Sequence, residues 1–115
     1  MTRETFLKKL NTAPDDIQFT DTMAVIDAGF TFTPTGFRNG DLNNEPGQNS
    51  GSCKLLAFAR REGLSEAQVL ACFGDYYRKD VLNNPSGTDH QNIRNFMRTG
   101  WKGVSFEGEP LAPRA

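Results

Sequence analysis

The sequence predicts an α+β fold, in which about five helices pack on a small antiparallel sheet of two or three short strands. Apolar residues recur at helical spacing in several separate stretches of the chain. Two other stretches, residues 30–33 and residues 103–108, alternate apolar and polar side chains as strands do. Both are centred on phenylalanine, and we expect them to pair with each other. The length of 115 residues suits a single domain, residues 1–115.

Composition and charge exclude several classes of protein. Thirteen Lys and Arg against fourteen Asp and Glu give a net charge of −1, so no basic field would attract a nucleic acid. No apolar run approaches the roughly 18 residues that a membrane span needs, and we expect no membrane partner. The N-terminus lacks the apolar core of a secretory signal, which predicts a cytoplasmic protein. We expect a monomer or a weak homodimer.

Short helices and a strand are predicted near the N-terminus, and a frayed tail is predicted at the C-terminus. Residues 2–11 and residues 20–29 are predicted to form two helices, because each has apolar residues on one side and a threonine that can cap its start. The first strand follows directly and ends at Pro34, since proline has no backbone N–H to donate. Near the other end of the sequence, Pro110 and Pro113 predict a frayed tail.

A long polar segment, residues 39–52, follows the first strand. It holds one hydrophobic residue, Leu42, beside three glycines, one proline and four asparagines. The dipeptide Asn39-Gly40 predicts a tight turn, but one apolar side chain is too few for a return strand, so we doubt a hairpin. Structureless segments of this length tend to be functional or disordered in compact domains.

Two helices are predicted beyond this segment from their start and stop residues. One covers residues 53–61, with Ser52 as its N-cap and Gly63 just after its end. The other covers residues 89–98, capped at residue 88 or 89, with Gly100 after its end.

The longest predicted helix lies between these two. Ser65 and Gln68 form a capping box, in which each side chain can satisfy the other residue's backbone N–H. Apolar residues then follow at helical spacing for roughly four to five turns. Gly74 falls in the middle of this helix, where a glycine costs about 1 kcal/mol relative to alanine. We attribute the presence of glycine at this position to a packing contact too close for a Cβ atom.

The glycines and Lys54 at the start of the helix over residues 53–61 suggest a phosphate cradle. Backbone N–H groups and the helix dipole favour an anion at such a position. The spacing does not match the nucleotide-binding pattern, so a nonspecific anion pocket and simple capping both stay open. Asp41, Asn43 and Glu45 imitate a calcium loop, but proline and serine stand where the loop needs glycine and glutamate. We therefore expect no metal and no other cofactor.

A cysteine and a histidine raise the hypothesis of a catalytic site. Cys53 would lie in the first turn of a helix beside Lys54, where its pKa would be lowered. His90, the only histidine, lies at another predicted helix start, and Asp89 or Asp80 could orient it. The alternative is that Cys53 is a small buried residue and His90 a local hydrogen-bond partner. Neither cysteine belongs to a CxxC pair, so zinc is not supported.

A polar cluster on the last two long helices suggests a ligand site. Arg78 and Arg94 could clamp a carboxylate or a phosphate, or they could belong to a structural network of ion pairs and backbone hydrogen bonds. The residues that we expect to bind a ligand are Asn43, Asn49, Ser52, Lys54, Tyr77, Arg78, Asp80, His90 and Arg94.

Several motifs together resemble the HopJ family of type III effectors, over about residues 19–111. The resemblance implies a bacterial protein that acts in virulence and is delivered into a host cell by type III secretion. It implies no established catalytic residue. The motifs that carry it are Phe30-Thr31-Phe32-Thr33-Pro34-Thr35, Asn49-Ser50-Gly51-Ser52-Cys53-Lys54, Cys72-Phe73-Gly74, Tyr76-Tyr77-Arg78, Asp89-His90, Asn92-Ile93-Arg94-Asn95-Phe96-Met97 and Gly100-Trp101.

The function that we expect is a binding module for a small anionic ligand or a host protein. Its pocket would lie between the helix start at Ser52, the helix over residues 89–94 and residues 76–80. One alternative is a small enzyme centred on Cys53 and His90. The other is a cytosolic housekeeping domain that is not secreted.

Overall fold

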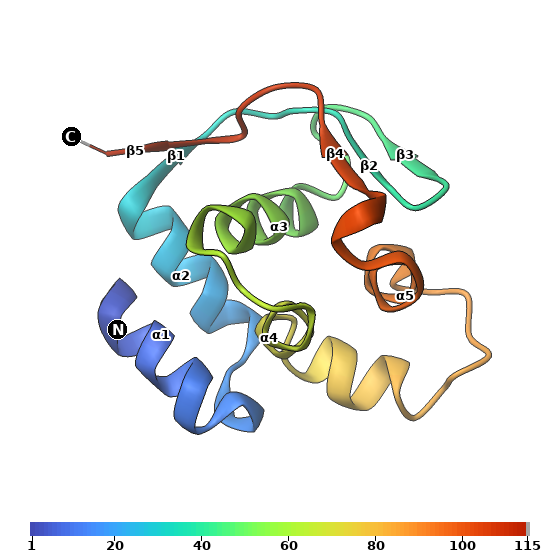
Figure 1. The fold of residues 1–115 in the computed structure, drawn as a ribbon, viewed down its shortest axis with the longest axis horizontal. Helices are drawn as coiled ribbons and strands as arrows, with labels where there is room; N and C mark the ends of the chain where they lie inside the picture. The colour runs from blue at the N-terminus through green and yellow to red at the C-terminus, as the bar shows by residue number, and fades with distance from the viewer. Residues whose placement is uncertain (115) are drawn as a thin grey trace.

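A central helix, α3 (Ser50–Glu62), lies beneath the strands and is surrounded by the other helices (Figure 1). The computed structural model describes residues 1–114. Helix α3 is buried on nearly all sides, as is typical of a helix in the middle of a core. Its buried residues are Cys53, Leu55, Leu56, Ala57, Phe58 and Ala59.

The remaining helices confirm the predicted order of elements. They are α1 (Arg3–Thr12), a 3-10 turn η1 (Pro14–Asp16), α2 (Phe19–Gly29), α4 (Glu66–Cys72), a π-helix η2 (Tyr76–Val81), α5 (Gln91–Thr99) and a 3-10 turn η3 (Gly100–Gly103). Thr2 caps α1 as expected, through a bond that its side chain accepts from Thr5 N. Helix α2 instead begins with a capping box of Gln18 and Asp21, so the expected cap at Thr20 is wrong.

Within residues 1–114, five short strands form two antiparallel sheets. They are β1 (Phe30–Phe32), β2 (Phe37–Asn39), β3 (Leu42–Asn44), β4 (Val104–Phe106) and β5 (Leu111–Pro113). One sheet pairs β1 with β5, and the other has the order β3-β2-β4. The α+β class and the antiparallel pairing are confirmed. The expected direct pairing of β1 with β4 is wrong, because each has another partner.

The two sheets are parts of one long ribbon. Phe32 pairs with Leu111, and Phe37 pairs with Phe106. The segment between β1 and β2 therefore spans as many residues as the segment between β4 and β5, and the strand register is kept from one sheet to the next. Backbone bonds from Thr33 N to Pro110 O and from Glu107 N to Gly36 O continue the pairing between the sheets. The predicted frayed tail is therefore wrong: it forms β5, at a sheet edge where proline is tolerated.

Strands β2 and β3 form a hairpin, contrary to expectation. Asn39 pairs with Leu42 across a two-residue turn. Gly40 occupies the first turn position with φ +64°, a left-handed conformation that hairpin turns need and glycine adopts freely. The return strand was missed because one of its polar residues, Asn44, is buried.

The helix predicted to run unbroken past Gly74 is broken there. The capping box of Ser65 and Gln68 forms as expected and starts α4. Gly74 then has φ +64°, which ends that helical run, and η2 follows. A Cβ at Gly74 would lie 2.6 Å from the backbone nitrogen of Phe19. The close contact that we inferred is present, but it marks a bend and not the middle of a helix.

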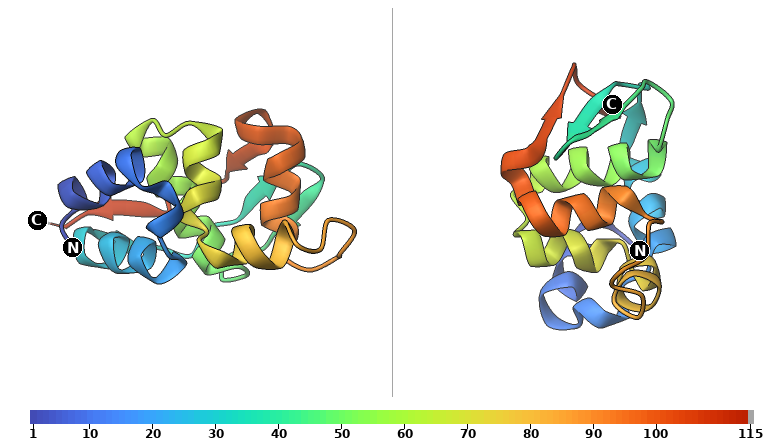
Figure 2. Two further views of the ribbon diagram at one scale, coloured as in Figure 1. Left: turned by 90° about the horizontal axis from the view of Figure 1, so that it is seen from below. Right: turned by 90° about the vertical axis from the view of Figure 1, so that its right-hand side faces the viewer.

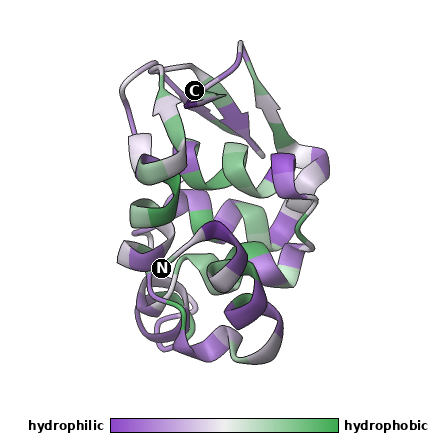
Figure 3. Ribbon diagram, turned by 90° about the vertical axis from the view of Figure 1, so that its left-hand side faces the viewer, coloured by the Kyte–Doolittle hydropathy of each residue, from purple (hydrophilic) through white to green (hydrophobic). Residues whose placement is uncertain are grey.

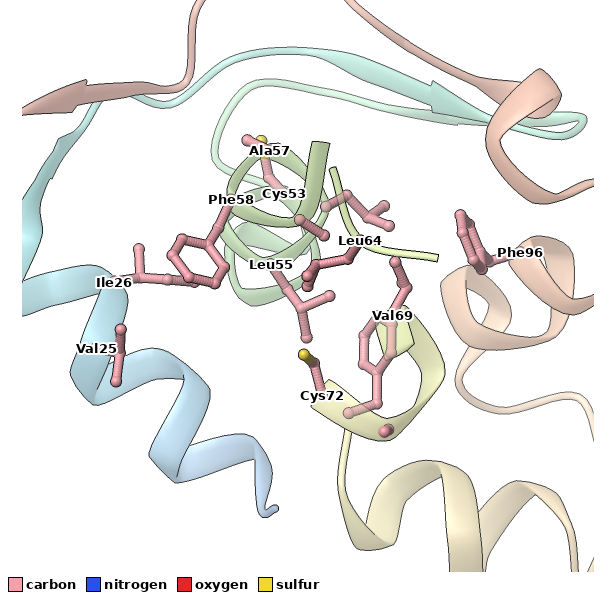
Figure 4. Close-up of a cluster of buried hydrophobic side chains, with 14 of the residues drawn as sticks. Val25, Ile26, Cys53, Leu55, Ala57, Phe58, Leu64, Val69, Cys72 and Phe96 are labelled. Carbon is pink, nitrogen blue, oxygen red and sulfur yellow. The ribbon is translucent and has the colours of Figure 1, made fainter. Parts of the chain in front are cut away.

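The core joins α3 to its neighbours on every side. Ile26 of α2 lies beside Phe58 of α3, and Leu55 of α3 lies near Val69 and Cys72 of α4 (Figure 4). Polar and apolar residues alternate along the outer helices, as expected for helices with one buried face (Figure 3). Within residues 1–114, no helix has the length and hydropathy needed to cross a bilayer.

Candidate functional site

A cavity of about 510 Å³ opens where α3 and α5 begin. The right-hand view of Figure 2 shows these two helices one above the other, starting on the same side. The polar residues that line the cavity, which we call the amide wall, are Gln48, Asn49, Ser52, Gln91 and Asn92. The ring-bearing residues that line it, which we call the aromatic wall, are Phe19, Phe73, Tyr76 and His90.

Both helices begin at a residue in the left-handed conformation. Asn49 precedes α3 with φ 53° and ψ 45°, and His90 precedes α5 with φ 51° and ψ 47°. Within residues 1–114 they are the two non-glycine residues with positive φ. Neither side chain caps its own helix. The first N–H groups of both helices therefore have no side-chain acceptor, and α-helical geometry provides none for them either.

These helix starts differ from the predicted ones. Helix α3 begins at Ser50, so Ser52 lies within its first turn and is not the N-cap. Helix α5 begins at Gln91, so the N-cap is His90 and not residue 88 or 89. The predicted ends at Gly63 and Gly100 are confirmed as the C-cap residues of the two helices.

A network of asparagines, in which Asn44 and Asn92 are buried and Asn49 is exposed, holds the two helix starts together. Asn49 Nδ2 donates to Asn44 Oδ1 at 2.7 Å, which draws the Asn49 side chain away from its own helix. Asn92 Nδ2 donates to the same oxygen at 3.1 Å, and Asn44 Nδ2 donates back to Asn92 Oδ1 at 3.3 Å. Asn39 Nδ2 donates to Asn92 O at 2.8 Å. Strand β3 thus connects the two helix starts through the amide group of Asn44, which is why a polar residue stands there.

His90 is held in the aromatic wall by a carboxylate. Its Nε2 lies 3.1 Å from Asp80 Oδ2, which is why its side chain does not cap α5. Its ring lies 5.2 Å from the Tyr76 ring, measured between centroids. Asp80 is not among the residues that line this cavity. The expected pairing of Asp80 with His90 is present, at the start of α5.

Three of the nine expected ligand-binding residues line the cavity: Asn49, Ser52 and His90. Two others have structural partners elsewhere. Arg78 donates to the backbone oxygens of Ile17, Pro14 and Ala71. Arg94 is 8% exposed and donates to the backbone oxygens of Asp89, Asn84 and Pro85. Both arginines thus serve the structural network that the sequence left open as an alternative.

The remaining expected residues also lie outside the cavity lining. Lys54 forms an ion pair with Asp27 at 2.9 Å and lies over the ring of Phe32. Asn43 is exposed on β3, and Tyr77 is half-buried against the core.

Of the two other members of the hypothetical catalytic site, Asp89 lies beside His90, with its Oδ2 3.7 Å from His90 Nε2, whereas Cys53 has different surroundings. Cys53 is 1% exposed, its Sγ lies 3.6 Å from Thr35 O, and it does not line the cavity. Burial raises the pKa of its thiol to about 11, so the expected lowered pKa is wrong. Asp89 forms a 2.7 Å ion pair with Arg94, which lowers the pKa of that carboxyl. Within residues 1–114, no three His, Cys, Asp or Glu side chains are placed to hold a metal ion.

Sequence reasoning placed Tyr76 and His90 at the pocket but missed Phe19 and Phe73, the other half of the aromatic wall. Phe19 and Phe73 occur in helical patterns, where aromatic residues normally indicate core. Gln91 and Asn92 lie in the segment predicted to border the pocket, residues 89–94, but were not among the expected ligand-binding residues. One signal points to both helix starts, since asparagine and histidine are enriched in the left-handed conformation and each lies near a predicted helix start.

Fold and site together define a small α+β protein with one mixed polar and aromatic cavity between two helix starts. The chain belongs to the HopJ type III effector protein family, whose model matches residues 3–111. It is also similar to a solved structure described as "Crystal structure of unknown function protein VPA0580". The two chains are 47% identical with a TM-score of 0.97, and the match covers 99% of this chain and 95% of the other. No curated protein matches the sequence.

Proposed function

We propose that this protein is a binding module for a small anionic ligand, held where α3 and α5 begin. One observation carries the proposal. The two non-glycine residues with positive φ among residues 1–114, Asn49 and His90, both border the same cavity. Such residues cost free energy, and they cluster at ligand sites because the surrounding structure enforces them there.

The backbone geometry explains why the ligand would be an anion. A left-handed residue followed by a helical one directs successive N–H groups into a concave nest that suits an anion. Asn49 and His90 each create this arrangement at the head of a helix. Each helix start also carries about half a positive charge from its dipole. Two such ends at one cavity support a dissociation constant on the order of 1 mM for a simple anion.

The side chains of the cavity are consistent with this charge preference. No Asp or Glu lines it among the described residues. Two carboxylates lie beside His90: Asp80 Oδ2 is 3.1 Å and Asp89 Oδ2 is 3.7 Å from its Nε2, and Asp89 is also paired with Arg94. Ser52 and Gln48 add hydroxyl and amide groups that can donate to a bound oxygen.

The proposal is tested by titrating the ¹⁵N-labelled protein with inorganic phosphate and with acetate. We expect saturable shifts of the backbone amide signals of Gly51 and Asn92, which lie in the two first turns, and a rise in melting temperature that follows ligand concentration. Shifts spread evenly over the surface, without saturation, would contradict an anion site at this place.

A pair of matched substitutions isolates the effect of a negative charge at the cavity on anion binding. Gln91→Glu places a carboxylate in the first turn of α5, where it favours the helix but repels a bound anion. We expect about a tenfold or greater loss of phosphate affinity. Gln68→Glu makes the same change in the first turn of α4, away from the cavity, where glutamate also suits the capping box. Equal phosphate binding by both variants would contradict the proposal.

We also propose, on family membership, that the protein is a type III secretion substrate. The test is export of a reporter fused to residues 1–115 in a bacterium with an intact secretion system and in one without it. Export in neither strain would favour the alternative of a resident cytosolic domain, and export in both would contradict dependence on type III secretion.

A further inference from the structure

We infer that the ligand is an aromatic anion, with a flat aromatic ring beside its anionic group, as in an aromatic carboxylic acid. The anionic part of this inference rests on the proposed function. The aromatic part rests on the aromatic wall of the cavity.

The aromatic wall is a continuous series of rings. Phe19 stacks on Phe73 with centroids 6.2 Å apart and an interplanar angle of 13°. Tyr76 meets Phe19 edge-on at 5.3 Å, and His90 follows at 5.2 Å from Tyr76. Aromatic rings favour such offset and edge-on neighbours, so a further ring placed against this series would gain the same interactions.

Part of this wall is available to a ligand. Tyr76 is 45% exposed although it is a large aromatic residue, and it lines the cavity. It is also the first residue of η2, and π-helical turns are rare and occur often at functional sites.

The ring surface directly adjoins the anion-binding helix start. A Cβ atom added to Gly51 would lie 2.8 Å from Cζ of Phe19, so the first turn of α3 rests against the edge of that ring. One small molecule can therefore contact both the wall and the amide groups of the helix start. The 510 Å³ volume lies within the range of ordinary small-molecule sites.

Apolar side chains complete the ring site. Leu42 of β3 and Ile93 of α5 also line the cavity. A flat ring can thus be enclosed by apolar groups while a carboxylate attached to it reaches the helix starts. Such a combination of apolar lining and few polar groups is typical of sites that orient a ligand.

Three probes of similar size separate the two parts of the inference. Benzoate has both the ring and the charge, cyclohexanecarboxylate has the charge without the flat ring, and benzamide has the ring without the charge. Affinities are measured from the shift of the Gly51 amide signal. We expect benzoate to bind about two- to tenfold more tightly than cyclohexanecarboxylate, and more tightly than benzamide.

A matched pair of variants locates the ring. Tyr76→Leu keeps an apolar side chain and removes the aromatic face, so we expect the preference for benzoate over cyclohexanecarboxylate to shrink. Met97→Leu changes a similarly exposed residue on α5 that does not line this cavity, and the preference should stay.

Each outcome bears on one part of the inference. Equal affinity for benzoate and cyclohexanecarboxylate would overturn the aromatic ligand and leave the anion site standing. Equal affinity for benzoate and benzamide would overturn the anion site. A preference for benzoate that persists in Tyr76→Leu would overturn the placement of the ring on this wall. Absence of binding by all three probes would overturn both proposals.

Discussion

Gly74 shows how a single residue can determine the path of the chain. Its left-handed conformation ends the helical run that starts with α4, and the backbone of Gln18 and Phe19 occupies the space where a side chain would begin. Gly74 therefore brings the start of α2, with Phe19, against Phe73 and Tyr76. The aromatic wall depends on this contact.

We predict that Gly74→Ala destabilises the protein by about 2–5 kcal/mol, because it adds left-handed strain to a backbone clash. Gly47→Ala is the control: Gly47 has φ +87°, but a Cβ there would meet nothing within 4 Å. We expect that variant to lose only about 1–2 kcal/mol. Urea denaturation measures both, and equal losses would mean that the contact with α2 does not matter.

Strand β3 explains how polar residues can specify an element. Asn44 is 4% exposed and bonds to both Asn49 and Asn92, whereas its neighbour Asn43 is exposed. The strand therefore alternates burial as strands do, but with an amide and not an apolar residue on the inner side. A pattern of hydrophobicity cannot detect such a strand.

We predict that Asn44→Ala costs about 2 kcal/mol or more, because it leaves the buried amide of Asn92 without its partner and also removes the bond to Asn49. Asn43→Ala, one residue away on the exposed side, should change stability by no more than about 0.5 kcal/mol. Thermal denaturation compares the two variants. The same small effect in both would show that the asparagine network does not hold the helix starts.

Most helices could be predicted from sequence, because their signals are local. The capping box of Ser65 and Gln68 and the glycines after α3 and α5 act within one turn of the chain. Strand pairing could not be predicted in the same way. The pairs β1–β5 and β2–β4 join segments more than sixty residues apart, and their register depends on packing that no local pattern contains.

The candidate site was predictable in part, for the same reason. Asn49, Ser52 and His90 were found because polar residues at helix starts are a local signal. Phe19 and Phe73 were not, because only the tertiary fold distinguishes an aromatic residue beside a cavity from one in the core. The arginines seemed suited to an anion, yet Arg78 and Arg94 are bonded to backbone oxygens.

At the scale of the whole molecule, two buried thiols connect stability to pH. Burial raises the pKa of Cys53 to about 11 and that of Cys72 to about 12, from an ordinary value of 9.0. The folded protein thus holds these protons more tightly than the unfolded chain. Their contribution is complete below pH 9 and is lost as the pH rises toward 11 and 12.

We predict that Cys72→Ala makes stability less dependent on pH in this range. Between about pH 9 and 10.5, the normal protein should lose on the order of 1–2 kcal/mol more than the variant. Urea denaturation at several pH values measures this difference. Comparing changes with pH removes the constant cost of the cavity that the substitution creates. Parallel curves for the two proteins would contradict the effect.

The long interrupted ribbon has a consequence for synthesis. As the chain emerges from the ribosome, β1 and β2 appear early, but β4 and β5 follow only after about seventy further residues. Until then, β1 in particular has unpaired edges that could join another nascent chain. The high sequence separation of the paired segments also implies slow folding for a protein of this size. Premature termination before β5 would leave this edge permanently open to aggregation.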